Sequence, residues 1–84
     1  MSNPIPISTH KHARQLLELV QQDTRFVVGS IDPDHPDYAG YYNLEQATLA
    51  AGDLEDATSK SFLVFELWQD AQGQWVSDFE DKRL

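Results

Sequence analysis

Apolar and polar residues follow their clearest pattern in the last third of the chain. Residues 62–68 are rich in aromatic and β-branched side chains, residues 69–74 are polar and include Gly73, and residues 75–79 are again largely apolar. Two such runs joined by a short polar segment predict an antiparallel hairpin over residues 62–79. An isolated hairpin is marginal in water, so we expect the other elements to pack on it.

Two upstream segments have helical features. In the first, apolar residues repeat at the spacing of one helical face: Ala13, Leu16, Leu17 and Val20. A helix that begins near a cap at residues 8–9 would turn the last three of them toward the sheet. The preceding residues 1–8 include two prolines, so we predict that they form a flexible leader.

The second helical segment has a capping signature at its start. Asn43 is a strong N-cap residue, and Gln46 stands three positions later, where its side chain can reach back to the cap. Gly52 is typical of a helix end, which gives a predicted helix over residues 43–51. Residues 53–58 are then either one more helical turn or an acidic loop.

Strand character also appears in the middle of the chain. Residues 25–31 are β-branched and aromatic and predict a strand, whereas residues 32–37 contain two prolines and predict a loop. We interpret residues 38–42 as the end of that loop, with a short strand beside residues 25–31 as the alternative. The element order is then α-β-α-β-β.

This order predicts an α+β fold with two layers. We expect a small three-stranded sheet that includes the C-terminal antiparallel hairpin and carries both helices on one face. A chain of 84 residues has room for one core, so residues 9–84 are predicted to form a single domain.

The predicted strand over residues 62–68 is apolar on both faces, because alternate side chains point to opposite sides of a sheet. One face has Leu63, Phe65 and Leu67. The other face has Phe62, Val64 and Trp68. If both helices cover the first face, the second is either covered by the middle loop and its tyrosines or contacts a partner. Phe62, Val64 and Trp68 are therefore candidate partner-binding residues.

The charge of the chain limits its partners. The net charge is −8, and residues 32–81 contain twelve carboxylates but a single base, Lys60. A field of that sign repels nucleic acid and acidic membrane surfaces and attracts basic proteins. We therefore expect no direct nucleic-acid binding and no membrane contact. Asp53, Glu55 and Asp56 are the carboxylates that we assign to partner binding.

Little in the sequence indicates catalysis. The chain has no cysteine, no glycine-rich phosphate loop and no apolar run long enough to cross a bilayer. Residues 1–12 lack the apolar core of a secretory signal, so a cytoplasmic location is expected. We interpret His10 and His12 as exposed residues of a first helical turn. We predict no enzymatic activity and no cofactor.

The loop predicted at residues 32–37 is our alternative candidate for a metal site. It contains Asp32, Asp34, Asp37 and His35, and its oxygen ligands at alternate positions resemble the start of an EF-hand. The glycine and the glutamate that such a loop requires are missing, so we favour a solvated loop over a weak calcium or magnesium site.

Two functions remain as hypotheses. We favour a small protein-interaction module that binds a protein partner, or a second copy of itself, through the aromatic face of its C-terminal hairpin. The alternative is an acidic inhibitor that mimics nucleic acid and blocks the basic site of a nuclease, a DNA-binding protein or an RNA-guided complex.

Overall fold

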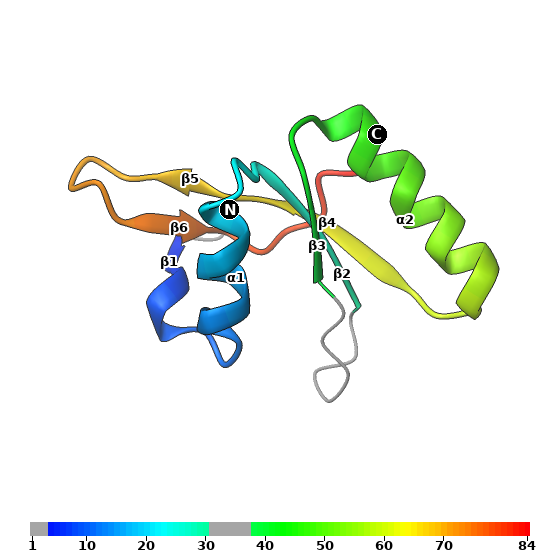
Figure 1. The fold of residues 1–84 in the computed structure, drawn as a ribbon, viewed down its shortest axis with the longest axis horizontal. Coiled ribbons are helices and arrows are strands. Elements are labelled where there is room, and N and C mark those ends of the chain that lie inside the picture. Colours follow the sequence, from blue (N-terminus) through cyan, green and yellow to red (C-terminus); the bar gives the residue numbers. More distant parts are fainter. Residues whose placement is uncertain (1–3, 31–37) are drawn as a thin grey trace.

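The computed structural model describes residues 4–30 and 38–84, which form two small antiparallel sheets and two helices (Figure 1). The first sheet has the strand order β3-β2-β4, and the second has the order β1-β6-β5. In chain order, the elements are β1 (Ile5–Pro6), the 3-10 turn η1 (Ile7–Thr9), α1 (Ala13–Val20), β2 (Phe26–Ser30), β3 (Tyr38–Tyr41), α2 (Leu44–Thr58), β4 (Phe62–Glu66), β5 (Trp68–Gln69) and β6 (Trp75–Ser77). The predicted α+β class is confirmed.

The two helices pack on opposite faces of the sheet β3-β2-β4 (Figure 1). Leu16 of α1 belongs to one core cluster with Val27, whereas Ala47 and Ala51 of α2 belong to the other with Val28. The expectation that both helices share one face is wrong. Adjacent residues of a strand face opposite ways, and since Val27 and Val28 are both apolar, each face of β2 requires its own cover.

The predicted hairpin over residues 62–79 is divided between the two sheets. β4 pairs with β2, while β5 pairs with β6, and Leu67 lies between β4 and β5. The Leu67 N–H donates to the Arg25 carbonyl at 2.8 Å, which anchors the point where the chain leaves one sheet for the other. The hairpin therefore exists only as the short pair Trp68–Gln69 and Trp75–Ser77.

Residues 38–41 form strand β3, so our interpretation of this segment as a loop end is wrong. β3 pairs antiparallel with β2, with Tyr41 opposite Phe26 and Tyr38 opposite Gly29. Because β2 is the central strand, both of its edges need hydrogen-bonding partners, and β3 satisfies the edge that β4 leaves open. This pairing overrides the low strand propensity of Gly40.

Helix α2 begins as predicted and ends later. The Asn43 side chain accepts a hydrogen bond from the Gln46 backbone N–H at 2.8 Å, which confirms the N-cap. The helix then continues through Gly52 to Thr58 instead of ending near residue 51. Leu54 packs against the core in this added segment, and that contact offsets the roughly 1 kcal/mol that a glycine costs inside a helix.

The N-terminal segment is part of the fold from Ile5 onward. Ile5–Pro6 pair with β6, and Ile7 is completely buried. The predicted leader therefore contributes a short strand and a buried side chain to the fold. Helix α1 starts at Ala13 with His12 as its N-cap, and Leu17, which we expected to face the sheet, is 38% exposed.

The residues after β6 run along the outer edge of β4. The Lys82 N–H donates to the Val64 carbonyl, and the Val64 N–H donates to an Asp81 carboxylate oxygen. Arg83 then forms an ion pair with Glu55 of α2. This segment covers a sheet edge that would otherwise be open to pairing with another chain.

Candidate functional site

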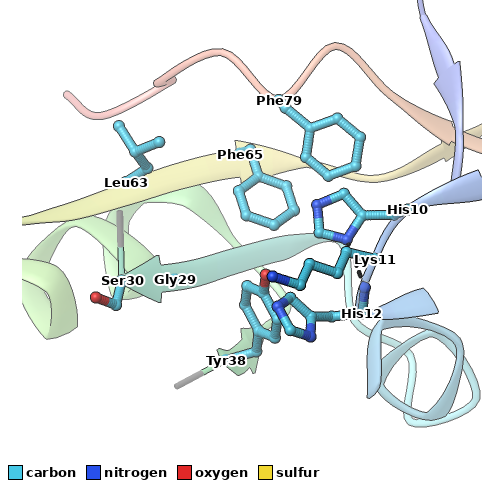
Figure 2. Close-up of a pocket in the computed structure, with 9 residues that line it drawn as sticks. All are labelled: His10, Lys11, His12, Gly29, Ser30, Tyr38, Leu63, Phe65 and Phe79. Carbon is cyan, nitrogen blue, oxygen red and sulfur yellow. Dashed lines mark hydrogen bonds between the residues drawn. The ribbon is translucent and has the colours of Figure 1, made fainter. Parts of the chain in front are cut away.

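A partly open cavity of about 260 Å³ lies beside the start of α1, on the face of the sheet β3-β2-β4 that α1 covers (Figure 2). We call it the aromatic pocket. Its lining residues come from several separate segments: His10, Lys11, His12, Gly29, Ser30, Tyr38, Leu63, Phe65 and Phe79.

The floor of the aromatic pocket depends on a glycine. Gly29 stands between Tyr38 of β3 and Leu63 of β4, so these residues form one row across the three strands. A Cβ atom at Gly29 would lie 2.8 Å from two carbons of the Tyr38 ring and 3.4 Å from the Phe65 ring. The missing side chain therefore lets the Tyr38 ring lie across the centre of the row.

The rings of Tyr38, Phe65 and Phe79 form the inner wall. The ring of Phe79 stacks on the imidazole of His10, with centroids 4.8 Å apart and an interplanar angle of 17°. Phe79 also contacts Phe65 at 5.0 Å, and Tyr38 meets Phe65 edge to face at 6.3 Å. Such arrangements add favourable ring contacts to the burial of apolar area. They give the pocket a rigid aromatic lining.

Phe79 is held in a backbone conformation that bulky residues rarely adopt. Its φ is +53°, in the left-handed region. The Phe79 N–H donates to the Ser77 hydroxyl at 3.0 Å, and Ser77 is completely buried, so the turn is fixed from inside the domain. The resulting conformation places the phenyl ring between His10 and Phe65, at a cost of roughly 1–2 kcal/mol in backbone energy.

The remaining wall is polar and comes from residues 10–12, between η1 and α1. The backbone N–H of His12 donates to Nδ1 of His10 at 3.0 Å, and the two imidazole centroids are 5.8 Å apart. Burial, and secondly the nearby His12, lowers the pKa of His10 below its usual value. Burial also raises the pKa of Tyr38. The lowered pKa of His10 favours its neutral imidazole form.

Our interpretation of His10 and His12 as exposed helical residues is wrong. Both are half-buried, and both precede the first residue of α1. Because residues 10–12 are not helical, the two side chains line the same pocket instead of pointing to different sides of a helix. The sequence carried one usable signal, a run of nitrogen-bearing side chains in an acidic protein, but nothing in it showed that the aromatic rings lie beside this run.

The predicted aromatic docking face is not assembled in the structure. Phe62 is 5% exposed and Val64 is completely buried, and both pack in the core cluster that includes Ala47 and Ala51 of α2. Of the two alternatives, cover within the chain is the one that the structure shows for these two residues, and α2 with Tyr41 supplies it. Trp68 lies in the other sheet, where it is half-buried and pairs with Val76.

The three predicted carboxylates of α2 do not form one group. Asp53 and Asp56 are exposed, as the partner-binding hypothesis requires. Glu55 instead accepts hydrogen bonds from Arg83 and from the Phe62 N–H. The hydrogen bond from Arg83, followed by that from Phe62, lowers the pKa of the Glu55 carboxyl below its usual value. Glu55 therefore joins α2, β4 and the C-terminal segment.

Within residues 4–30 and 38–84, no group of three or more His, Cys, Asp or Glu side chains has the geometry to hold a metal ion. The acidic loop at residues 32–37, our alternative cation site, lies outside the described residues. None of the described helices has the length and apolar character to span a membrane.

Comparison with protein-family models, with curated proteins and with solved structures found no match to this chain.

Proposed function

We propose that the protein is a small protein-interaction module that receives one aromatic side chain of a partner protein in the aromatic pocket. The observation that supports this proposal is a ring-lined cavity of about 260 Å³, in which the Tyr38 ring lies over Gly29 and Phe65 and Phe79 form the wall. Pockets of this kind, which hold an aromatic anchor, contribute most of the binding energy at many interfaces.

The size of the cavity favours a single side chain over a large cofactor. Sites for drug-sized ligands occupy about 300–1,000 Å³, and the aromatic pocket is smaller. One phenyl or indole ring stacked beside Tyr38 and Phe79 would replace water with ring contacts on several sides. A lone ring of this kind binds weakly, with a Kd of about 1 mM, because the rest of the partner interface is missing.

A titration followed by NMR tests the proposal. The ¹⁵N-labelled protein is titrated with the peptide acetyl-Gly-Trp-Gly-amide and, separately, with acetyl-Gly-Ala-Gly-amide. We expect the tryptophan peptide to shift the amide signals of Gly29, Tyr38, Phe65 and Phe79, and the alanine peptide to leave them in place. Equal shifts with both peptides, or shifts confined to other regions, would contradict the proposal.

Phe79→Gly provides the sharpest variant for this titration. Glycine adopts a φ of +53° without strain, so the substitution removes the ring while relaxing the backbone. The variant should retain the amide spectrum of the folded protein and lose affinity for the tryptophan peptide at least fivefold. Tyr42→Ala, which removes a 66% exposed ring outside the aromatic pocket, is the matched control and should bind normally.

A second candidate function is supported by the distribution of charge on α2. The exposed acids Glu45, Asp53 and Asp56 belong to this helix, whereas Lys82 and Arg83, two bases of the same half of the chain, are engaged in ion pairs. This arrangement supports binding to a basic protein surface, as an acidic inhibitor or nucleic-acid mimic would require.

Charge reversal separates this candidate from a non-specific effect of net charge. The double variant Asp53→Lys, Asp56→Lys should weaken binding of a fluorescent deca-lysine probe more than Glu18→Lys, Asp23→Lys, which changes the net charge equally in the other half of the molecule. Affinity should also fall steeply between 50 and 200 mM salt. Equal losses in the two double variants would refute a site on α2. Self-association stays a prediction, which light scattering across protein concentration tests.

A further inference from the structure

We propose that the aromatic pocket selects a ring that carries a carboxylate, which Lys11 and the Nε2–H of His10 recognise. The inference rests on the proposed function, because the ring must enter the pocket before its substituent can be recognised. The chemistry is that of an aromatic amino acid at the C-terminus of a partner chain.

The described residues that line the aromatic pocket carry no negative charge, although the chain as a whole is acidic. The sequence has fourteen Asp and Glu against six Lys and Arg. None of the described residues that line the pocket is acidic, whereas His10, Lys11 and His12 together supply its polar wall. An anion is repelled by most of the acidic surface of the chain, and it finds a positive charge and polar N–H groups at this wall.

His10 is preset as a hydrogen-bond donor. Its Nδ1 atom accepts the backbone N–H of His12 at 3.0 Å, so a neutral imidazole carries its proton on Nε2. Stacking on Phe79 fixes the plane of the ring. In Figure 2 the nitrogen that the backbone bond leaves available lies on the pocket side of the imidazole, facing Phe65. A carboxylate on that side of the imidazole therefore accepts this hydrogen bond without a change of rotamer.

Lys11 supplies the positive charge. Its side chain is exposed and lines the pocket, and in Figure 2 it extends between His10 and Tyr38. It makes no ion pair within the described part of the chain. An exposed ammonium strengthens carboxylate binding only severalfold, and a neutral donor adds a similar factor. We therefore expect an overall preference of about five- to tenfold for a ring with a carboxylate.

Matched ligands that differ only in charge test the inference. Acetyl-tryptophan is compared with acetyl-tryptophan amide, and the peptide acetyl-Gly-Gly-Trp with a free carboxylate is compared with its amide, each by NMR titration at pH 7.5. The acids should bind about five- to tenfold more tightly than their amides. If the peptide acid binds more tightly than acetyl-tryptophan, the ligand is a chain terminus. The reverse order would contradict a chain terminus as the ligand and would count against the proposed function as well.

Three variants assign the preference to its residues. Lys11→Gln and His10→Phe should each reduce the ratio of acid to amide affinity to about twofold, while amide binding changes less than twofold. Lys60→Gln removes the same charge from the end of α2, away from the pocket, and should leave the ratio unchanged. His10→Phe retains a ring that can stack on Phe79, so it isolates the hydrogen bond.

The outcomes separate the inference from the proposed function. Equal binding of acids and amides at the aromatic pocket would overturn the carboxylate preference and leave the proposed function standing. Binding of neither ligand would overturn both. A preference that survives in both Lys11→Gln and His10→Phe, or that falls equally in Lys60→Gln, would overturn the assignment to these two side chains.

Discussion

The burial of Val64 beneath α2 leads to a direct measurement of stability. Val64 has no exposed surface and packs in one cluster with Val28, Ala47, Ala51 and Phe62. In the alternative, where this face of β4 is a docking surface for a partner, truncation of Val64 would hardly affect the stability of the isolated protein. We therefore compare Val64→Ala with the unmodified chain.

The structure sets the expected magnitude. Val64→Ala removes two methyl-sized groups, each worth about 0.8 kcal/mol in burial, and the cavity left between β4 and α2 adds about 1 kcal/mol. The free energy of unfolding should fall by about 2–3 kcal/mol. A domain of this length has roughly 4–13 kcal/mol in total, so the loss corresponds to a fall in Tm of roughly 8–24 °C.

Urea denaturation followed by the fluorescence of the two tryptophans provides the assay. Leu49→Ala is the control, because Leu49 lies on α2 and is 65% exposed, and its truncation should change the free energy of unfolding by less than about 0.5 kcal/mol. If the two variants lose similar amounts, or if Val64→Ala loses less than about 0.5 kcal/mol, the burial of this face by α2 is refuted.

Three further predictions follow from single contacts. Glu55→Gln should make the free energy of unfolding depend less on pH under acidic conditions. The hydrogen bond from Arg83 lowers the pKa of Glu55 in the folded state. Ionised Glu55 therefore stabilises the fold above its unfolded pKa of about 4.3, and this stabilisation is lost as pH falls through the folded pKa. Urea midpoints between pH 2 and 7 check this, and parallel curves for the two proteins would contradict it. Gly29→Ala should displace the Tyr38 ring and destabilise the fold by about 1–3 kcal/mol, seen as shifted Tyr38 ring signals and a lower urea midpoint; an unchanged ring position would show that the glycine is not required. Gly73→Ala should lower the free energy of unfolding by about 1 kcal/mol. The cause is its φ of +79° alone, because nothing lies within 4 Å of the added Cβ. A loss below about 0.3 kcal/mol by calorimetry would exclude backbone strain at this position.

Local signals in the sequence identified most elements of the fold. The Asn43 cap, the strand at β2 and the turn at Gly73 each depend on neighbouring residues, and the structure contains all three. The sequence also predicted helix α1 and its inward-facing Leu16, although Leu17 is exposed and His12, not residues 8–9, stands at the N-cap. These features depend on backbone geometry and short-range hydrogen bonds, which the order of residues determines.

The candidate site could not be predicted in the same way. The aromatic pocket joins His10, Gly29, Tyr38, Phe65 and Phe79, which are far apart in the sequence. No period or motif relates such residues. Their proximity results from the strand register and from the left-handed turn at Phe79, and both depend on pairing between distant segments.

The sequence by itself determined the α+β class, the start of α2 and the acidic charge, because composition and local propensity are sufficient for these properties. Tertiary structure decided which surfaces are available for function. The sequence of an apolar strand with two similar faces, such as β4, does not reveal which face a helix covers. A helix on either face would bury the same kind of side chain. The placement of α1 and α2 on opposite faces buried Phe62 and Val64 and left the open aromatic surface beside His10.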